Sequence, residues 1–263
     1  GETIGAYALS EAEAGSDPAS MRMSAKAIER GYVLDGAKQW ITNAGIASFF
    51  VVFARTGEPG PRGISAFGIE PGLGLRVGAE IEKMGQHSSS TAEIAFEQME
   101  APVEALLGGE GEGLELALAT LGASRIAVAA QASGIAAAAI DVAADYARTR
   151  VAFGSPIGRF QGISFPLDEM SARLDAARLL LLHAARLKDA DNPLGVAGAK
   201  AKLVATRVAV EACDVAVQTL GGYGYSAEYP VERYFRDAKV TEIYEGTSEI
   251  QRLVIARDML GRL

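Results

Sequence analysis

Glu245 is the side chain in this sequence whose surroundings best suit acid–base chemistry. It stands in the stretch 240–251, directly before Gly246 and the start of a predicted helix. Ser248 and Gln251 have the spacing of a capping box, in which a hydroxyl caps a helix start and an amide reaches back. The helix dipole there favours a carboxylate, and the glycine lets a ligand approach the backbone. This is a suitable place for a general base, although the same residues also fit a polar turn before a terminal helix.

Three further stretches carry residues that could hold a ligand. Trp40, the single tryptophan, ends a strand-like run. Around a predicted helix end lie Arg148, Arg150 and Arg159, whose guanidinium groups could meet phosphate. Gly221-Gly222 follows a predicted helix, and bare glycine could admit a pyrophosphate. Each stretch also has a structural explanation: a core tryptophan, solvated arginines and a helix stop.

Composition excludes several classes of protein. The 263 residues include 49% hydrophobic residues and carry a formal charge of −8, which disfavours non-specific binding to nucleic acid or to anionic membranes. Cys213 is the single cysteine, so no intrachain disulfide can form, and its apolar helical context predicts a buried packing role. His87 and His183 are far apart and have no ligand-spaced partners, so no metal site is expected. The uncharged run 126–140 is too short for a membrane span.

Residues 1–105 are predicted to form a β-rich domain, a barrel or a sandwich, because turn-forming residues separate many short strand-like runs. One candidate loop, 31–38, nearly spells a phosphate-binding motif, but its lysine is one place late and its continuation looks like a strand. The predicted strands are 4–9, 23–29, 32–34, 38–42, 49–55, 64–70, 75–81 and 92–97.

Residues 106–263 are predicted to form an antiparallel four-helix bundle, which makes the fold α+β. Alanine and leucine recur at helical spacing, and short breaks separate the helices. Gly109, Gly111 and Gly113 lack the dinucleotide-binding spacing and are expected to form a flexible inter-domain connection. The predicted helices are 112–150, 161–189, 195–220, 230–238 and 247–261.

The motifs taken together resemble one family over the whole chain, the acyl-CoA dehydrogenases. The resemblance implies a middle β-barrel domain and a C-terminal four-helix domain. The helical domain that precedes them in the family is expected to be missing here. The matching segments are 7–11, 14–17, 38–43, 150–154, 160–161, 218–224, 236–239 and 244–247.

The family chemistry implies roles for particular residues. A base removes the α proton of an acyl-CoA thioester, the β hydrogen leaves as hydride to FAD, and a trans-2-enoyl-CoA results, as in fatty-acid β-oxidation. By resemblance, Glu245 is the base, and its backbone N–H helps to hold the thioester carbonyl. Ser16, Arg125 and Gly246 are the expected substrate contacts. Electrons are expected to pass to an electron-transfer flavoprotein.

The resemblance also implies which residues bind FAD. Those expected to face the flavin within one subunit are Tyr7, Leu9, Ser10, Trp40, Ile41, Thr42, Thr247 and Glu249. Those expected to hold the diphosphate and adenine of a neighbouring subunit's FAD are Arg150, Phe153, Gln161, Gln218, Gly221 and Gly222. A homo-oligomer follows, a dimer or a dimer of dimers. The expected location is the bacterial cytoplasm or the mitochondrial matrix.

Some residues depart from the family pattern. Some family members place the base at the position of Ser124. Serine cannot serve as that base, which favours Glu245. Glu13 adds a carboxylate to a substrate loop, Gly122 replaces a common acidic residue, and Glu249 replaces a common glutamine. Two alternatives stay open: a related flavoenzyme that uses oxygen as its acceptor, and a truncated relative without catalytic activity.

Overall fold

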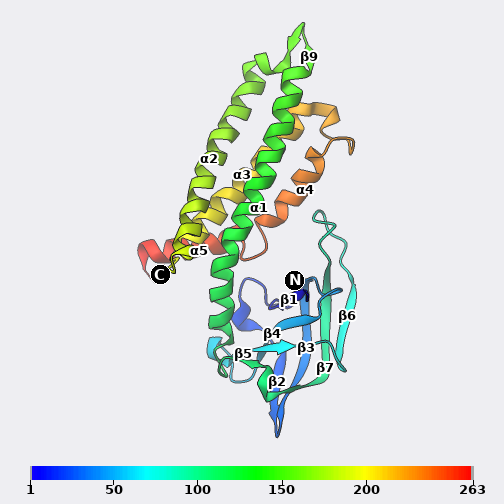
Figure 1. The fold of residues 1–263 in the computed structure, drawn as a ribbon, viewed down its shortest axis with the longest axis vertical. Helices are drawn as coiled ribbons and strands as arrows, with labels where there is room; N and C mark the ends of the chain where they lie inside the picture. The colour runs from blue at the N-terminus through cyan, green and yellow to red at the C-terminus, as the bar shows by residue number, and fades with distance from the viewer. Residues whose placement is uncertain (1, 262–263) are drawn as a thin grey trace. The chain divides into compact units, whose positions relative to one another are not determined.

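The computed structural model describes residues 2–261, and the chain divides into two compact units (Figure 1). One unit runs to Lys83 and resumes from His87 to Thr120. The other contains Met84–Gln86 and continues from Leu121. The first is built on a mixed sheet and the second on helices, which confirms the predicted α+β class.

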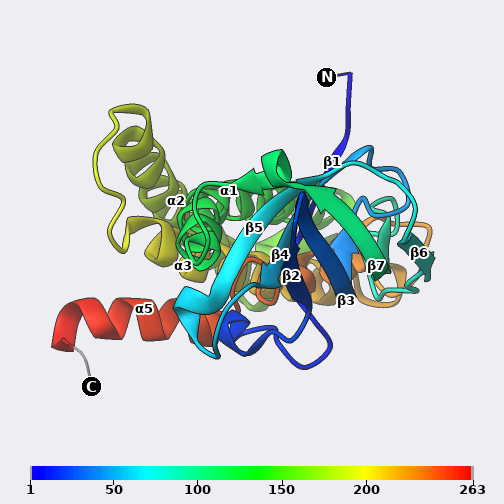
Figure 2. The same ribbon diagram turned by 90° about the horizontal axis from the view of Figure 1, so that it is seen from below.

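The sheet of the first unit is mixed, with the strand order β6-β7-β3-β2-β4-β5-β8, and β1 pairs with β4 (Figure 2). The β1–β4 pair is parallel, and the long β3–β7 and β4–β5 pairs are antiparallel. The strands are β1 (Gly5–Ala8), β2 (Ser24–Ile28), β3 (Gly31–Thr42), β4 (Phe49–Arg55), β5 (Ile64–Ile69), β6 (Leu75–Glu80), β7 (Thr91–Pro102) and β8 (Leu106–Leu107).

Strand β3 is one continuous element, so the predicted turn between 32–34 and 38–42 is wrong. Gly36 lies at a shift in the pairing of β3 with β7 and has φ +139°. A Cβ there would lie 2.9 Å from Met23. The glycine therefore marks a bulge and a close approach rather than a chain reversal. The rejection of a phosphate-binding loop at 31–38 agrees with this strand.

The core of the first unit consists of apolar side chains on alternating strand positions. Phe50, Val52, Phe67 and Ile94 are all buried in one cluster. Burying such side chains typically stabilises a fold by about 1.5–3 kcal/mol each. This cluster fixes the register of the strands, since a slip of one residue would turn it outward.

The glycines before the first long helix are packed, so the predicted flexible connection is wrong. The Gly111 N–H donates to Ser65 Oγ at 2.9 Å. A Cβ on Gly113 would lie 2.4 Å from the carbonyl carbon of Ser65. Glycine is needed here because two backbones meet closely.

The second unit is helical, and its helices begin and end within three residues of the predicted bounds. Alanine- and leucine-rich periodicity, interrupted by glycine and proline, explains this agreement. The helices are α1 (Gly113–Thr149, whose first turns belong to the first unit), α2 (Gln161–Asp189), α3 (Ala197–Leu220), α4 (Val231–Thr241) and α5 (Ser248–Leu260). A hairpin of β9 (Val151–Ala152) and β10 (Ser155–Pro156) joins α1 to α2.

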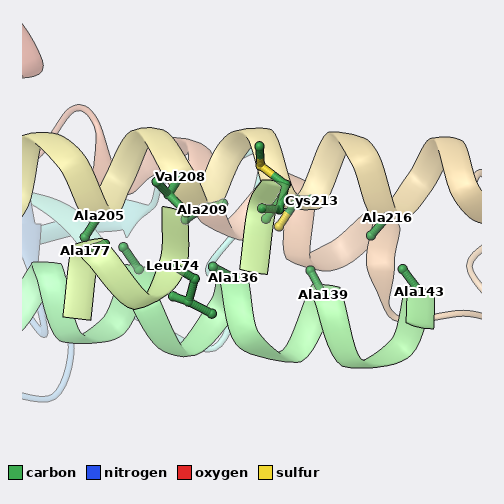
Figure 3. Close-up of a cluster of buried hydrophobic side chains, with 14 of the residues drawn as sticks. Ala136, Ala139, Ala143, Leu174, Ala177, Ala205, Val208, Ala209, Cys213 and Ala216 are labelled. Atoms are coloured by element: carbon green, nitrogen blue, oxygen red, sulfur yellow. The ribbon is translucent and has the colours of Figure 1, made fainter. Parts of the chain in front are cut away.

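Small residues form the bundle core, where α1, α2 and α3 pack through facing alanines (Figure 3). Ala139, Ala177 and Ala209 are among its fully buried members. Cys213 lies in the same cluster, as predicted, and burial raises the pKa of its thiol to about 12. The thiol is therefore an inert packing group at neutral pH. Residues of α4 join this core, whereas α5 extends away from it (Figure 2).

Helix α1 is longer and more apolar than the run 126–140 suggested. By length and composition alone, it is the one helix in residues 2–261 that could cross a membrane. Of its most apolar stretch, 39% is buried in the structure, where its alanines line the bundle core. A core helix passes the same test, so this property is weak support for a membrane span.

Candidate active site

The backbone around Glu245 forms a tight turn between α4 and α5. Glu245 has φ +54° and Gly246 has φ +87°, two consecutive left-handed residues. A Cβ on Gly246 would lie 2.8 Å from Gln251 Nε2, so the turn requires glycine there. For Glu245 the same backbone region costs about 1–2 kcal/mol. The surroundings must hold this turn in place.

The predicted capping box at Ser248 and Gln251 is wrong by one residue. Thr247 is the N-cap of α5, and its hydroxyl accepts the Ile250 N–H at 3.3 Å. Ser248 is instead the first helical residue, and its N–H donates to Glu242 O at 2.9 Å. Because the chain enters the helix through an extended Thr247, the cap falls one position earlier than the sequence pattern suggests.

The Glu245 carboxylate meets helix α1. The Ser124 hydroxyl donates to Glu245 Oε2. Arg125 follows Ser124, and burial lowers the pKa of its guanidinium, an effect that the nearby charge of Glu245 opposes. Within residues 2–261, the buried Arg125 Nε has no hydrogen-bond partner. The structure thus brings together two residues predicted for catalysis and substrate binding, and adds Ser124.

Two donors hold the residue after Glu245. The Gly246 carbonyl accepts from Lys202 Nζ at 2.8 Å and from Gln251 Nε2 at 2.7 Å. Burial lowers the pKa of the Lys202 ammonium to about 8. On the other side of Glu245, the Tyr244 hydroxyl donates to Gln131. The carboxylate therefore stands on a firmly held segment, which a base for a carbon acid needs.

The residues predicted to hold a neighbouring subunit's dinucleotide gather at the hairpin end of the bundle. Arg150, Gly221 and Gly222 line an open pocket of about 590 Å³. Nothing lies within 4 Å of a Cβ built on either glycine, so the backbone is open to a ligand. Gln218 is exposed on the last turn of α3.

The remaining members of this predicted set are exposed as well. Phe153 is 97% exposed in the hairpin turn, and Gln161 is exposed at the start of α2. An arginine beside bare glycines and an exposed aromatic ring fits the phosphates and adenine of FAD. Arg150 also stacks over the Tyr223 ring at 5.9 Å, which holds the guanidinium at the pocket.

In the first unit, the predicted flavin contacts follow β1 and β3. Trp40 is 57% exposed with φ +64°, so its reading as a core residue is wrong. It lies at a second shift in the β3–β7 pairing, which turns the indole outward. Ile41 is 1% exposed and its side chain packs in the core, so the structure leaves it little surface for a cofactor contact. Thr42 is exposed at the strand end.

The other first-unit candidates lie on β1 and the loop after it. Tyr7 donates from its hydroxyl to Ala117 O at 3.3 Å. Leu9 is buried, and Ser10 accepts the Gln39 N–H at its carbonyl oxygen at 2.9 Å. Ser16 is exposed farther along the loop.

The two candidates in the second unit beside Glu245 occupy the start of α5. Thr247 uses its hydroxyl as the helix cap, and Glu249 is exposed in the first turn. A backbone hydrogen bond lowers the pKa of Glu249, with help from Thr247 and Arg252. Glu249 pairs with Arg252 at 3.1 Å.

Sequence reasoning missed two buried lysines. Lys38 lies inside the first unit and contacts Glu11 Oε1 at 2.8 Å and Leu9 O at 3.0 Å. Lys202 lies on the buried face of α3, in helical register with Ala205. That register was the available signal, because a lysine on an otherwise apolar helix face is expected to have a partner.

Comparison with known proteins gives a consistent result across both units. The chain matches the family model "Acyl-CoA dehydrogenase, middle domain" over residues 6–99 and "Acyl-CoA dehydrogenase, C-terminal domain" over residues 111–260. It is 48% identical over 263 residues to an acyl-CoA dehydrogenase of Bacillus subtilis, covering 99% of this chain and 69% of that one. It is 47% identical over 258 residues to a short-chain specific acyl-CoA dehydrogenase of Clostridium acetobutylicum. That match covers 97% of this chain and 68% of the relative.

Solved structures agree with these relatives. The butyryl-CoA dehydrogenase of Megasphaera elsdenii superposes with a TM-score of 0.96 at 46% identity, over 98% of this chain and 68% of that one. The structure of PigA with FAD and proline superposes with a TM-score of 0.95 at 34% identity. That superposition covers 99% of this chain and 69% of PigA. The chain spans about two thirds of the length of these proteins. It therefore belongs to the acyl-CoA dehydrogenase family of oxidoreductases, with FAD as its cofactor.

Proposed function

We propose that this protein dehydrogenates a short-chain acyl-CoA thioester between its α and β carbons, with Glu245 as the general base. The observation that carries the proposal is the carboxylate itself. It stands on a left-handed turn, accepts a hydrogen bond from Ser124 and has Arg125 as a neighbour. Similar proteins are named short-chain specific and butyryl-CoA dehydrogenases, and these names support a short acyl group on the substrate.

The reaction divides between the protein and its cofactor. Glu245 removes the α proton, and the electrons of that C–H bond form the new double bond. When bound, FAD supplies the acceptor for the hydride that leaves the β carbon. The product is a trans-2-enoyl-CoA, and the proton remains on Glu245 until solvent or product release removes it.

The chain's own groups make the α proton removable. An α C–H is a weak acid, so the thioester carbonyl must be polarised while the base stands in contact with the carbon. We propose the Glu245 N–H as one donor to that carbonyl. Arg125 supplies a nearby positive charge. Its buried Nε has no hydrogen-bond partner within residues 2–261. Substrate could supply that partner.

FAD is proposed to bind with help from a second copy of this chain. Arg150, Gly221 and Gly222 surround an open pocket that suits a diphosphate, and the Trp40 indole is available to a flavin ring. The proposed acceptor of the electrons is an electron-transfer flavoprotein. Mixing the reduced protein with such a flavoprotein, and separately with oxygen, measures which of the two reoxidises it.

The test uses the full-length protein with FAD bound, under anaerobic conditions. Butyryl-CoA is expected to bleach the flavin absorbance. Glu245→Gln should still bind FAD, but its rate of flavin bleaching should fall by about 10²–10⁴-fold, because general-base catalysis contributes that much. Asp258→Asn is the matched control, since Asp258 is an exposed carboxylate on α5, the helix that begins just after Glu245. Rapid bleaching by Glu245→Gln would reject Glu245 as the base, and no bleaching of the wild type by any short acyl-CoA would reject the proposed reaction.

A further inference from the structure

The backbone of Glu245 and Gly246 is held by side chains from two helices. Lys202 on α3 and Gln251 on α5 donate to the same Gly246 carbonyl, at 2.8 Å and 2.7 Å. Gln251 Nε2 also lies 3.4 Å from Glu245 O. Neither Lys202 nor Gln251 has exposed surface. The turn therefore rests on two donors that water cannot easily replace.

Burying the Lys202 ammonium beside this turn costs free energy. Within residues 2–261, its ammonium bonds to a carbonyl and makes no ion pair within 4 Å. Burial lowers the pKa of Lys202 to about 8; the charges of Glu245, Glu242 and Glu249 oppose that shift and the charge of Arg125 adds to it. A methionine would fill the same space without the cost of burying a charge. Core packing alone does not explain a lysine here.

The turn itself supplies the reason for two strong donors. Glu245 is a non-glycine residue with φ +54°. Such backbone conformations persist only where the surroundings impose them, and they occur often at functional sites. The φ and ψ angles of Glu245 set the direction in which its side chain leaves the backbone. Ser124 then holds the far end of that side chain through Oε2.

We propose that Lys202 is a positioning residue for Glu245: with Gln251, it holds the left-handed turn that aims the carboxylate at the substrate α carbon. The proposal rests on the proposed function, in which Glu245 is the base. In this proposal Lys202 acts through the Gly246 carbonyl and not by contact with the substrate or the cofactor. Its loss should therefore slow proton removal while FAD and substrate still bind.

The experiment measures flavin reduction by stopped flow, anaerobically, with the full-length holoprotein and saturating butyryl-CoA. Lys202→Met is expected to lower the reduction rate by about 10–100-fold, because a misplacement of about 1 Å costs up to that much. The isotope effect with α-deuterated substrate should rise, since C–H cleavage then limits the rate more fully. The substrate dissociation constant should change by less than about threefold, because ground-state binding is untouched.

The controls separate positioning from folding. Lys200→Met removes an exposed lysine from the same helix and should leave rate and isotope effect unchanged. Lys202→Gln keeps a donor and should recover part of the rate lost in Lys202→Met. Gln251→Met removes the other donor and should slow reduction in the same way.

Two results would overturn the proposal. One is a folded, FAD-bound Lys202→Met that reduces its flavin at the wild-type rate with an unchanged isotope effect. The other is loss of folding in both Lys202 variants while Gln251→Met reacts normally, which would make Lys202 a purely structural residue. Glu245→Gln, measured in parallel, keeps the two proposals apart. If that variant reacts normally, the proposed function fails first, whatever Lys202 does.

Discussion

Lys38 in the sheet unit and Lys202 in the helical unit are both fully buried, but they are compensated differently. Lys38 Nζ forms an ion pair with Glu11 Oε1 at 2.8 Å and also donates a hydrogen bond to Leu9 O. Lys202 donates to the Gly246 carbonyl. Burial lowers the pKa of both ammonium groups to about 8.

The two settings predict different roles for the two lysines. Lys38 and Glu11 close a network, because Glu11 also accepts the backbone N–H groups of Arg22 and Met23. That network ties the loop after β1 to β3 and makes it part of the fold. Lys202 donates to the turn beside Glu245, the proposed base. We therefore expect the Lys38 pair to matter most for stability and Lys202 to matter most for rate.

The largest stability effect is expected from Lys38→Met. It leaves the Glu11 carboxylate, whose side chain is 11% exposed, without its cation. Removing one partner of a buried ion pair costs about 3–5 kcal/mol. Urea unfolding of the holoprotein measures the change, with Lys26→Met on β2, an exposed lysine, as control. A loss below about 1 kcal/mol, the range of exposed ion pairs, would contradict a stabilising role for the buried Lys38–Glu11 pair.

The pH dependence of stability should reveal both lysines. Each has a folded-state pKa of about 8, below the ordinary lysine value of 10.5, so the unfolded chain binds more protons between these pH values. The free energy of unfolding should therefore rise with pH from about 8 to 10.5, by about 1.4 kcal/mol per unit of pKa difference at most. Unfolding at several pH values checks this. In Lys38→Met part of the rise should disappear, and an unchanged rise in that variant would contradict the assignment.

Lys202→Met should cost less stability than Lys38→Met. It removes a hydrogen bond to a carbonyl that keeps its second donor, Gln251, so about 1–3 kcal/mol is expected. The same urea series measures both variants. If Lys202→Met were the more destabilised of the two while keeping its full flavin-reduction rate, the contrast between the two lysines would be reversed.

The smallest effect is expected from Ser124→Ala. The hydroxyl holds Glu245 Oε2, and a single hydrogen bond to a charged group contributes about 1.5–3 kcal/mol at most. The substrate must share the carboxylate during the reaction, so we expect a loss of about tenfold in flavin reduction. Stopped-flow reduction of Ser124→Ala beside Lys202→Met ranks the two supports of the base. A faster Ser124→Ala enzyme would show that the hydroxyl restrains the base rather than aiming it.

The sequence predicted the helices closely because alanine and leucine periodicity is local and glycine and proline mark its ends. It failed at β3, where Gly36 looks like a turn residue but forms a bulge against Met23. It placed the α5 cap one residue late, since Thr247 and Ser248 are chemically alike.

The site was only partly predictable. The motif containing Glu245 lies in one stretch, so a resemblance could find it. The contact between Ser124 and Glu245 joins residues 121 positions apart, and local patterns carry no signal for it. Buried lysines are missed for a related reason: a charged residue is ordinarily assigned to the surface, and only the register of its helix or strand argues otherwise.

The most direct test of the central claim measures exchange of the α protons of butyryl-CoA with D₂O. The holoprotein is reduced beforehand, so that no net oxidation occurs and the base acts alone. The wild-type protein is expected to incorporate deuterium at the α carbon, and Glu245→Gln is expected to lose that activity while still holding FAD. Equal exchange by both proteins would contradict Glu245 as the base.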